Sequence, residues 1–255
     1  MRKNKGKSKK ESKIKMGNKG KKKNEMVEFQ VLENQSDTVE KREAEVLELE
    51  KAEKLKKDLL EAGNMLRNEY AINLLLFKLK MINIKLEQKY ARAVIRNIDS
   101  RVKSSESIIK KLQRKGYEIS YAVAAEKLND IAGIRAVCFF VDDVYEIAEL
   151  LKQQKDIKLI KEKDYIKEPK KNGYQSLHLI MQVPFFSGET CIYQKIEVQL
   201  RTAIMDSWAE LDNQLCYKKE FLNTENAEEE LKAYSQLVVK MDKQMLRLRK
   251  QIKKL

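Results

Sequence analysis

Residues 176–200 are SLHLIMQVPFFSGETCIYQKIEVQL, two runs rich in apolar residues with a break at Pro184 and Ser187-Gly188. Turn-forming residues between two such runs are typical of a β-hairpin, here with strands at 176–183 and 191–200. Towards the end of the second run apolar and polar residues alternate, which is the pattern of a strand with one buried face. This stretch therefore predicts a β-sheet with one face on a core and the other open to polar groups.

The flanking sequence predicts helices around that sheet. Residues 134–141, IRAVCFFV, indicate another buried strand, and DDVYEIAELLKQQ after it indicates an Asp-capped helix. Helical spacing of apolar residues predicts further helices at 38–63, 65–89, 202–221 and 226–255. The fold class that we expect is α+β, with a mixed sheet of four to five strands flanked by helices.

Composition agrees with a helix-rich protein, since 36% of the 255 residues are charged and there are only 8 Gly and 2 Pro. The net charge of +14 is concentrated at one end, because residues 1–23 carry 12 Lys or Arg and one acidic residue. Such a segment cannot bury enough apolar surface to order itself, so it is either a solubilising tail or a contact for RNA. We expect a disordered basic tail at 1–36, helices packing on the core at 37–97, the core at 98–221 and a C-terminal helix at 222–255.

Several functional classes are disfavoured. No segment approaches the roughly 18 uninterrupted apolar residues of a membrane span. Cys138, Cys191 and Cys216 are widely spaced and lack a CxxC pair, which argues against both a disulfide framework and a zinc site. We expect a cytoplasmic protein without membrane contact and with reduced cysteines.

The segment SESIIKKLQRKG, residues 105–116 with Ser104 before it, predicts an amphipathic helix that ends at Gly116. Its apolar side holds Ile108, Ile109 and Leu112. The opposite side and the approach to the helix N-terminus carry groups that suit phosphate oxygens, namely Arg101, Lys103, Ser107, Lys111 and Arg114. The pattern fits a polyphosphate site, but taken alone it is weak, because ordinary amphipathic helices with a solvated basic face are common.

Two carboxylates stand out. Asp130 precedes a strand that contains Arg135, and Glu197 lies in the polar row of the last strand. On adjacent strands such a pair could hold Mg²⁺, which prefers oxygen ligands and commonly bridges to substrate phosphates. Spacing alone leaves open an exposed Asp in a turn and a Glu paired with Arg201.

The stretch EPKKNGYQSLHL, residues 168–179, contains the single His of the chain. If a strand begins near Gly173, then Tyr174, Ser176 and His178 share one face. A preceding loop rich in lysine, including Lys163, could meet phosphates while a base stacks on Tyr174. A lone His is nevertheless more often structural than catalytic.

Four stretches together resemble the RelA/SpoT-type alarmone synthetases, and specifically their small single-domain members, the GTP pyrophosphokinases. They are RVKSSESIIKKLQRKG, LNDIAGIRAVCFFVDDV, DYIKEPKKNGYQSLHLIM and IEVQLRTAIMDSWAELDNQLCYK, in the family's order between residues 101 and 218. The resemblance implies a nucleotidyltransferase-like fold and transfer of the ATP β,γ-pyrophosphate to the 3′-hydroxyl of GDP or GTP. This reaction makes the (p)ppGpp alarmones of the stringent response.

The resemblance also implies roles. Asp130 would bind Mg²⁺, and Glu197 would assist the metal and deprotonate the acceptor hydroxyl. ATP would be held by Arg101, Lys103, Ser107, Lys111, Arg114 and Arg135. On the acceptor side Tyr174 would stack on guanine beside Lys163, His178 and Gln199. Synthesis without hydrolysis is expected, because one His is too few for the usual alarmone-hydrolysing centre, and small relatives commonly form homotetramers.

The sequence departs from the family at two places. Asp212-Asn213 replace the customary Glu-His pair, and Lys161 replaces an Arg of longer members. Both changes bear on the acceptor, so a toxin-like synthetase that modifies tRNA or adenine nucleotides is an alternative. A non-enzymatic RNA- or ribosome-binding protein is another.

Overall fold

A computed structural model describes residues 42–43, 45–217 and 224–252. The predicted disordered tail, 1–36, lies outside them. The chain divides into two compact units, 1–54 and 55–255, and every named element belongs to the second. Residues 45–60 are helical. The other helices are α2 (Ala62–Tyr90), α3 (Ser105–Arg114), α4 (Tyr121–Lys127), α5 (Val141–Lys152), α6 (Ala203–Tyr217) and α7 (Thr224–Ile252).

The sheet has five strands in the order β1-β2-β5-β4-β3, with β2 and β5 parallel and the other neighbours antiparallel. This confirms the mixed sheet of an α+β fold. The strands are β1 (Ile95–Val102), β2 (Ala132–Cys138), β3 (Lys158–Asp164), β4 (Leu177–Ser187) and β5 (Thr190–Thr202). The expected start of the core at residue 98 falls inside β1.

The two edge strands, β1 and β3, are absent from the sequence-based prediction. Their sequences, IRNIDSRV and KLIKEKD, are rich in charge, and most of their residues are at least partly exposed. Charged side chains on an edge discourage pairing with another chain, but they also remove the apolar pattern by which a strand is recognised. Helix α4 was missed as well, because only Ala124 on it is buried.

The predicted hairpin is confirmed, with its turn at Gly188 and Glu189 between β4 and β5. Gly188 has a φ of +60°, which favours glycine. Pro184 is not part of the turn, since it lies within β4 opposite Tyr193. The pairing of β3 with β4 ends at Gln182, so Pro184 lies where β4 has no neighbour on that side.

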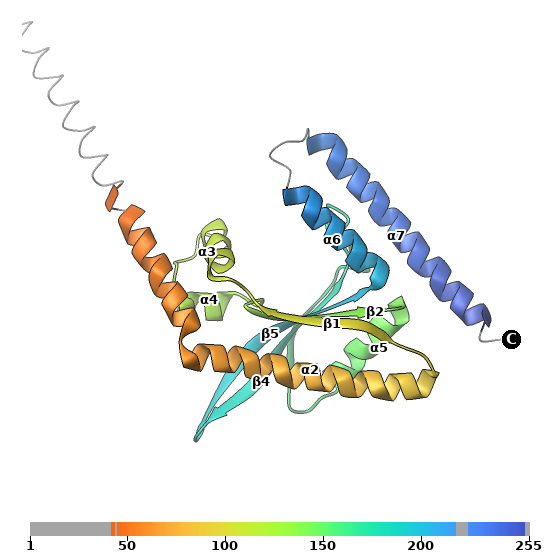
Figure 1. Ribbon diagram of the computed structural model, residues 1–255, viewed down its shortest axis with the longest axis horizontal. Helices are drawn as coiled ribbons and strands as arrows, with labels where there is room; N and C mark the ends of the chain where they lie inside the picture. Colours follow the sequence, from red (N-terminus) through yellow and green to blue (C-terminus); the bar gives the residue numbers. More distant parts are fainter. Residues whose placement is uncertain (1–41, 44, 218–223, 253–255) are drawn as a thin grey trace, which may run out of the picture. The chain divides into compact units, whose positions relative to one another are not determined.

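One face of the sheet forms the main core. Alternate residues of the three central strands, such as Ile134, Leu179 and Val198, are at most 2% exposed and pack with α2 and α5. In Figure 1 these two helices lie on one side of the strands, and α6 and α7 lie on the other. By the two-residue period of a strand, the intervening residues of the central strands point to the second face.

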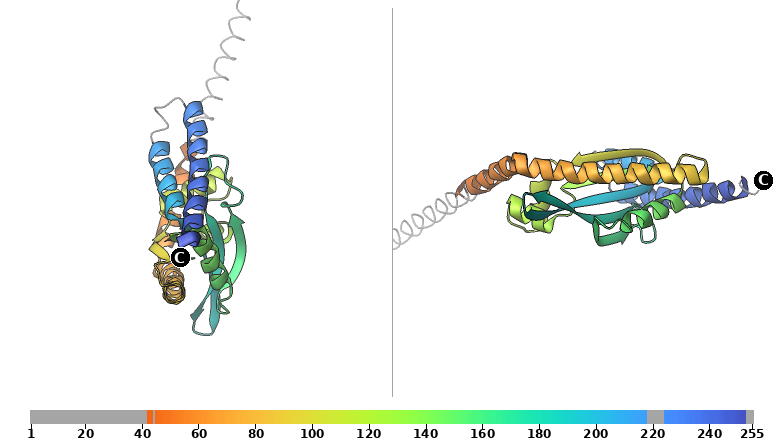
Figure 2. Two further views of the ribbon diagram at one scale, coloured as in Figure 1. Left: turned by 90° about the vertical axis from the view of Figure 1, so that its right-hand side faces the viewer. Right: turned by 90° about the horizontal axis from the view of Figure 1, so that it is seen from below.

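Helices α6 and α7 run side by side over the second face (Figure 2, left) and share a small apolar cluster that includes Trp208 and Val238. Helix α7 also fixes the segment before β4. The buried Ser235 donates to the carbonyl of Gly173 and accepts from Gln175 Nε2 at 3.0 Å. Gly173 has a φ of +91°, and a Cβ there would lie 2.5 Å from Ser235 Cβ, so the close approach requires glycine.

A buried carboxylate links α7 to the start of α6 and makes stability depend on pH. Asp242 is 4% exposed, accepts from Thr202 Oγ1 at 2.8 Å, and burial raises its pKa to about 6 although that hydrogen bond opposes the rise. Because the folded-state pKa is above the unfolded one, the folded protein gains stability as the pH falls through 6 and loses it as the pH rises.

We therefore expect the free energy of unfolding to be higher at pH 5 than at pH 7 by about 1 kcal/mol from Asp242 alone. Urea denaturation of the parent and of Asp242→Asn at both pH values measures this, since every other titrating group is common to the two proteins. An identical pH dependence of both proteins would contradict the prediction.

Candidate active site

The register of the five strands assembles a polar row across the second face of the sheet. One residue from each strand stands opposite the next, in the order Asp99, Arg135, Gln199, His178 and Lys163. In an adjacent row Arg101 is opposite Gly133, and Gly133 is opposite Glu197. Residues that are far apart in the sequence therefore share one surface, because paired residues of neighbouring strands point to the same side.

Helix α3 borders this surface. Its start is fixed as predicted, since Ser104 Oγ accepts from the backbone N–H of Ser107, and its apolar side is buried through Ile108 and Leu112. On the polar side, Lys111 Nζ lies 2.7 Å from Asp130 Oδ2, and Lys103 Nζ lies 3.1 Å from the same oxygen. Ser107 and Arg114 are exposed on that side. The predicted amphipathic helix is confirmed, and its basic side faces a carboxylate.

The Asp130 side chain is a carboxylate at neutral pH. Burial raises the pKa of this carboxyl, but the hydrogen bond from Lys111 and the charge of Lys103 outweigh burial and lower its pKa below the ordinary value. Its second oxygen, Oδ1, is buried and has no hydrogen-bond partner. A buried carboxylate oxygen without a partner is costly, so this atom is suited to a cation.

Glu197 is held at both oxygens. His178 Nδ1 lies 3.0 Å from Oε1, and Gln199 Nε2 donates to Oε2 at 2.8 Å. Burial raises the pKa of Glu197, but these two hydrogen bonds and the His178 interaction lower it overall, so the group is a carboxylate at neutral pH. Each oxygen retains a lone pair for a further partner.

Glu197 belongs to a closed ring of five side chains. Arg201 Nη2 donates to Gln199 Oε1 at 2.8 Å and to Tyr174 Oη at 2.6 Å, and Tyr174 Oη lies 3.0 Å from His178 Nε2. Since Arg201 can only donate, the Tyr174 hydroxyl gives its own hydrogen to His178 Nε2. His178 Nδ1 then carries the ring hydrogen and donates to Glu197.

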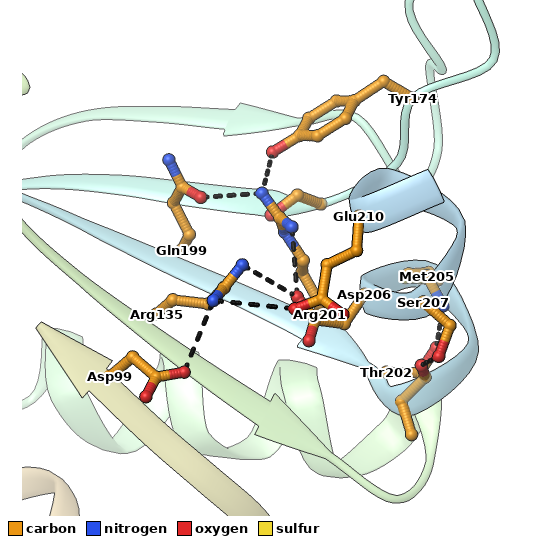
Figure 3. A network of polar contacts seen from close by, with 12 residues as sticks. Asp99, Arg135, Tyr174, Gln199, Arg201, Thr202, Met205, Asp206, Ser207 and Glu210 are labelled. Carbon is orange, nitrogen blue, oxygen red and sulfur yellow. Dashed lines mark hydrogen bonds and ion pairs between the residues drawn. The ribbon is translucent and has the colours of Figure 1, made fainter. Parts of the chain in front are cut away.

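Asp206 attaches to this ring from α6. Its Oδ1 lies 3.2 Å from Arg201 Nη1 and 3.3 Å from Arg135 Nη1 (Figure 3). Arg135 also lies 3.4 Å from Asp99 and 3.9 Å from Glu210. The alternative of an ion pair between Glu197 and Arg201 is therefore wrong. Gln199 bonds to both residues and lies between them, and Arg201 pairs with Asp206.

A pocket of about 150 Å³ lies between these groups. Both Asp130 and Glu197 line it. Its cationic side is formed by Arg101, Arg135 and Arg201, and Asn213 of α6 also lines it. The two carboxylates that the sequence separates by more than sixty positions thus border one cavity with a positively charged wall.

Tyr174 lies beside the pocket and is half-buried. Lys170 Nζ is 4.4 Å from the centre of its ring, and the Arg201 guanidinium is 5.0 Å from it. The ring centres of His178 and Tyr165 lie 5.9 Å and 6.2 Å away. The result is an aromatic and cationic patch next to Glu197.

Comparison with known proteins identifies the chain. Residues 100–221 match the family model described as "Region found in RelA / SpoT proteins". The chain is 38% identical over 190 residues to GTP pyrophosphokinase YwaC of Bacillus subtilis (strain 168), which covers 74% of this chain and 90% of the relative. It belongs to the RelA/SpoT family of small alarmone synthetases. GTP pyrophosphokinase YjbM of the same organism is 33% identical over 71% of this chain and 85% of its own.

Solved structures of small alarmone synthetases have the same fold. The crystal structure of small alarmone synthetase 1 from Bacillus subtilis, bound to its product pppGpp, superimposes with a TM-score of 0.67 at 30% identity. It covers 77% of this chain and 96% of its own. Small alarmone synthetase 2 of the same organism gives a TM-score of 0.65 at 36% identity, over 74% of this chain and 97% of its own.

Within this small alarmone synthetase, the departure at Asp212-Asn213 has a structural role. Asp212 Oδ2 accepts from Asn172 Nδ2 at 3.2 Å, and Asn172 Oδ1 accepts from the backbone N–H of Tyr174. Asp212 therefore helps to fix the loop that presents Tyr174. Ser176 lies beside Tyr174 as expected, is fully buried, and donates to the carbonyl of Leu200 at 3.2 Å.

Sequence reasoning missed three residues that hold the site together, namely Arg201, Asp206 and Tyr165. Arg201 and Tyr165 follow predicted site residues by a few positions, but nothing in a sequence shows which partner each will choose. Asp206 lies in the first turn of α6, where an acidic residue is already explained by the helix dipole. Its contact with two arginines depends on the packing of α6 over the sheet.

Proposed function

We propose that this protein transfers the β,γ-pyrophosphate of ATP to the 3′-hydroxyl of GDP or GTP and so synthesises (p)ppGpp. One observation carries the proposal: Asp130 and Glu197 line a single pocket between a basic helix and an aromatic patch. Pyrophosphate transfer by in-line attack needs neutralised phosphate oxygens and a positioned hydroxyl, and the site has groups for both. The names and the bound product of the relatives support the same reaction.

On the donor side, Arg101 and Arg135 line the pocket and would bind ATP. Lys103, just before α3, and Lys111, in its last turn, both lie next to Asp130, and they would contact phosphate oxygens as the nucleotide displaces them from the carboxylate. Ser107 and Arg114 would extend this basic side. These residues bind and orient the pyrophosphate.

The carboxylates suit Mg²⁺, because Asp130 Oδ1 has no protein partner and both groups are ionised at neutral pH. The part of the chain that the structure describes has no group of three or more acidic, His or Cys side chains placed to hold a metal. Two carboxylates plus substrate phosphates and water match the way Mg²⁺ is commonly bound at nucleotides. When bound, the ion would neutralise phosphate charge.

On the acceptor side, Glu197 would take the proton of the 3′-hydroxyl, using the lone pairs that His178 and Gln199 leave free. The hydrogen bonds from those two residues fix its orientation. Tyr174 would stack on guanine, with Lys163 and Lys170 near the acceptor phosphates. Displacing Lys170 from the Tyr174 ring would open the aromatic face.

We further propose that the protein is cytoplasmic, where its substrates are, and homo-oligomeric. Exposed apolar side chains on α2 and α7, such as Phe77 and Leu237, support association. None of the helices in the described ranges has the length and apolar character needed to cross a membrane.

The full chain, incubated with ATP labelled in its γ-phosphate, Mg²⁺ and one acceptor at a time, tests the function. The acceptors are GMP, GDP, GTP, ADP and tRNA. We expect labelled product with GDP and GTP together with release of AMP. Label on tRNA or ADP alone would support a toxin-like synthetase, and binding of RNA without any transfer would support the non-enzymatic alternative.

Tyr174→Ala tests the acceptor site. Base stacking on an aromatic ring contributes about 1 to 3 kcal/mol, so the KM for the acceptor should rise about 5- to 150-fold. The Kd for an ATP analogue should change by less than about twofold. Tyr174→Phe keeps the ring and Tyr193→Ala removes an exposed tyrosine of β5, so both should leave acceptor KM nearer the parent value. An unchanged acceptor KM in Tyr174→Ala would reject the stacking role.

A further inference from the structure

Asp206 is shared by two arginines of different parts of the site. It lies in the first turn of α6, its side chain is 14% exposed, and its Oδ1 is within 3.3 Å of both Arg135 and Arg201 (Figure 3). Both arginines line the pocket, but only Arg201 also belongs to the ring that holds Glu197 and Tyr174. A single carboxylate thus joins the two sides.

Arg201 depends on this contact. The residue is 6% exposed, and its Nε is buried without a hydrogen-bond partner. A buried guanidinium needs a compensating charge, because hydrogen bonds to neutral acceptors do not offset the free energy lost on desolvation. Its other partners are the neutral oxygens of Gln199 and Tyr174, so Asp206 supplies the negative charge that keeps Arg201 in place.

Arg135 has a different balance. It is more exposed and lies near three carboxylates, those of Asp99, Asp206 and Glu210, of which Glu210 is the most distant at 3.9 Å. A partly exposed arginine beside a pocket can exchange such carboxylates for an anion of higher charge. A nucleotide polyphosphate in that pocket is such an anion.

We propose that Asp206 is a positioning residue that couples occupancy of the donor pocket to the geometry of the acceptor side. When a donor nucleotide draws Arg135 to itself, the charge of Asp206 is left entirely to Arg201. Arg201 then holds Gln199 and Tyr174 more firmly, and through them Glu197. This inference rests on the proposed function, and it predicts that the donor increases affinity for the acceptor, and the acceptor for the donor, by the same factor.

Binding measurements with a non-hydrolysable ATP analogue and GDP, each alone and in the presence of the other, test the coupling. In the parent protein the analogue should tighten GDP binding by about fivefold or more, the usual lower range for coupled sites. In Asp206→Asn the coupling factor should fall below about twofold. The kcat should fall by a larger factor than that by which the KM for ATP changes. Asp206→Glu, which restores the charge, should recover part of the coupling.

Two comparisons separate coupling from a loss of folding. Glu210→Gln removes a more distant and more exposed carboxylate beside Arg135 and should leave the coupling within about twofold of the parent. Arg135→Gln removes the arginine that would contact the donor nucleotide, so the coupling should be lost. Adding Asp206→Asn to that variant should reduce the coupling no further. If Asp206→Asn does not fold, the Arg135→Gln and Asp206→Glu results decide.

The inference is overturned if the parent shows no coupling, or if Asp206→Asn keeps it. It is also overturned if the only effect of Asp206→Asn is fewer folded molecules with parental kinetics. Failure of the proposed function has a different signature, because the parent would then transfer no pyrophosphate to GDP or GTP under any of these conditions.

Discussion

Glu197→Gln is expected to reduce the rate of pyrophosphate transfer by about 1000-fold, within the 100- to 10,000-fold range of a positioned general base. The substitution preserves size but removes both the proton acceptor and the negative charge. The ring around it changes little in shape, since the amide oxygen can still accept from Gln199 or His178. The loss should therefore appear in the chemical step rather than in binding.

Single-turnover rates at saturating ATP and GDP measure this effect. The KM values should change by less than about fivefold, because neither substrate depends on Glu197 for most of its contacts. Glu189→Gln, an exposed acid in the β4–β5 turn, is a matched control and should react at the parental rate. A Glu197→Gln protein within about tenfold of the parent would exclude the role of general base.

The pH dependence gives a second measurement of Glu197. Its pKa is lowered by the hydrogen bonds from His178 and Gln199 despite burial. The carboxylate should consequently stay ionised as the pH falls to its ordinary range near 4.5, and loss of activity from this group should occur below that value. His178→Ala removes one of those hydrogen bonds and should move that loss to higher pH.

The sequence predicted those parts of the fold that carry a strong local pattern. The hairpin, the strand at 134–141 and the start of α3 at Ser104 each follow from periodicity or capping chemistry, and each is present in the structure, with β2 ending at Cys138. The edge strands lack such a pattern. β1 and β3 are strands because neighbours pair with them, and no local preference of IRNIDSRV or KLIKEKD indicates it.

The candidate site shows the same division. Alternation along β5 placed Glu197 and Gln199 on the face away from the core, and the register then brought Arg135 and His178 beside them. The choice of partners could not be predicted, because it depends on where α6 packs. Arg201 forms its ion pair with Asp206 and not with Glu197, and Glu197 pairs with His178.

Asp130→Asn is expected to reduce transfer by about 100- to 1000-fold, similar to the loss of a single electrostatic contact to a transferring phosphoryl group. The amide keeps the volume but no longer offers the charged Oδ1 that suits a cation. In the parent, Asp130 also holds Lys103 and Lys111, so its neutralisation frees both lysines for phosphate.

This double role distinguishes the prediction from simple damage to the pocket. In the absence of divalent metal, Asp130→Asn should bind an ATP analogue as tightly as the parent or more tightly, because two lysines no longer have to leave a carboxylate. Binding without metal should thus be kept or tightened, whereas the single-turnover rate with metal should fall. Lys103→Ala and Lys111→Ala should weaken ATP binding in both proteins. If affinity and rate fall together in Asp130→Asn, then Asp130 serves to shape the pocket, and the catalytic role proposed for it is wrong.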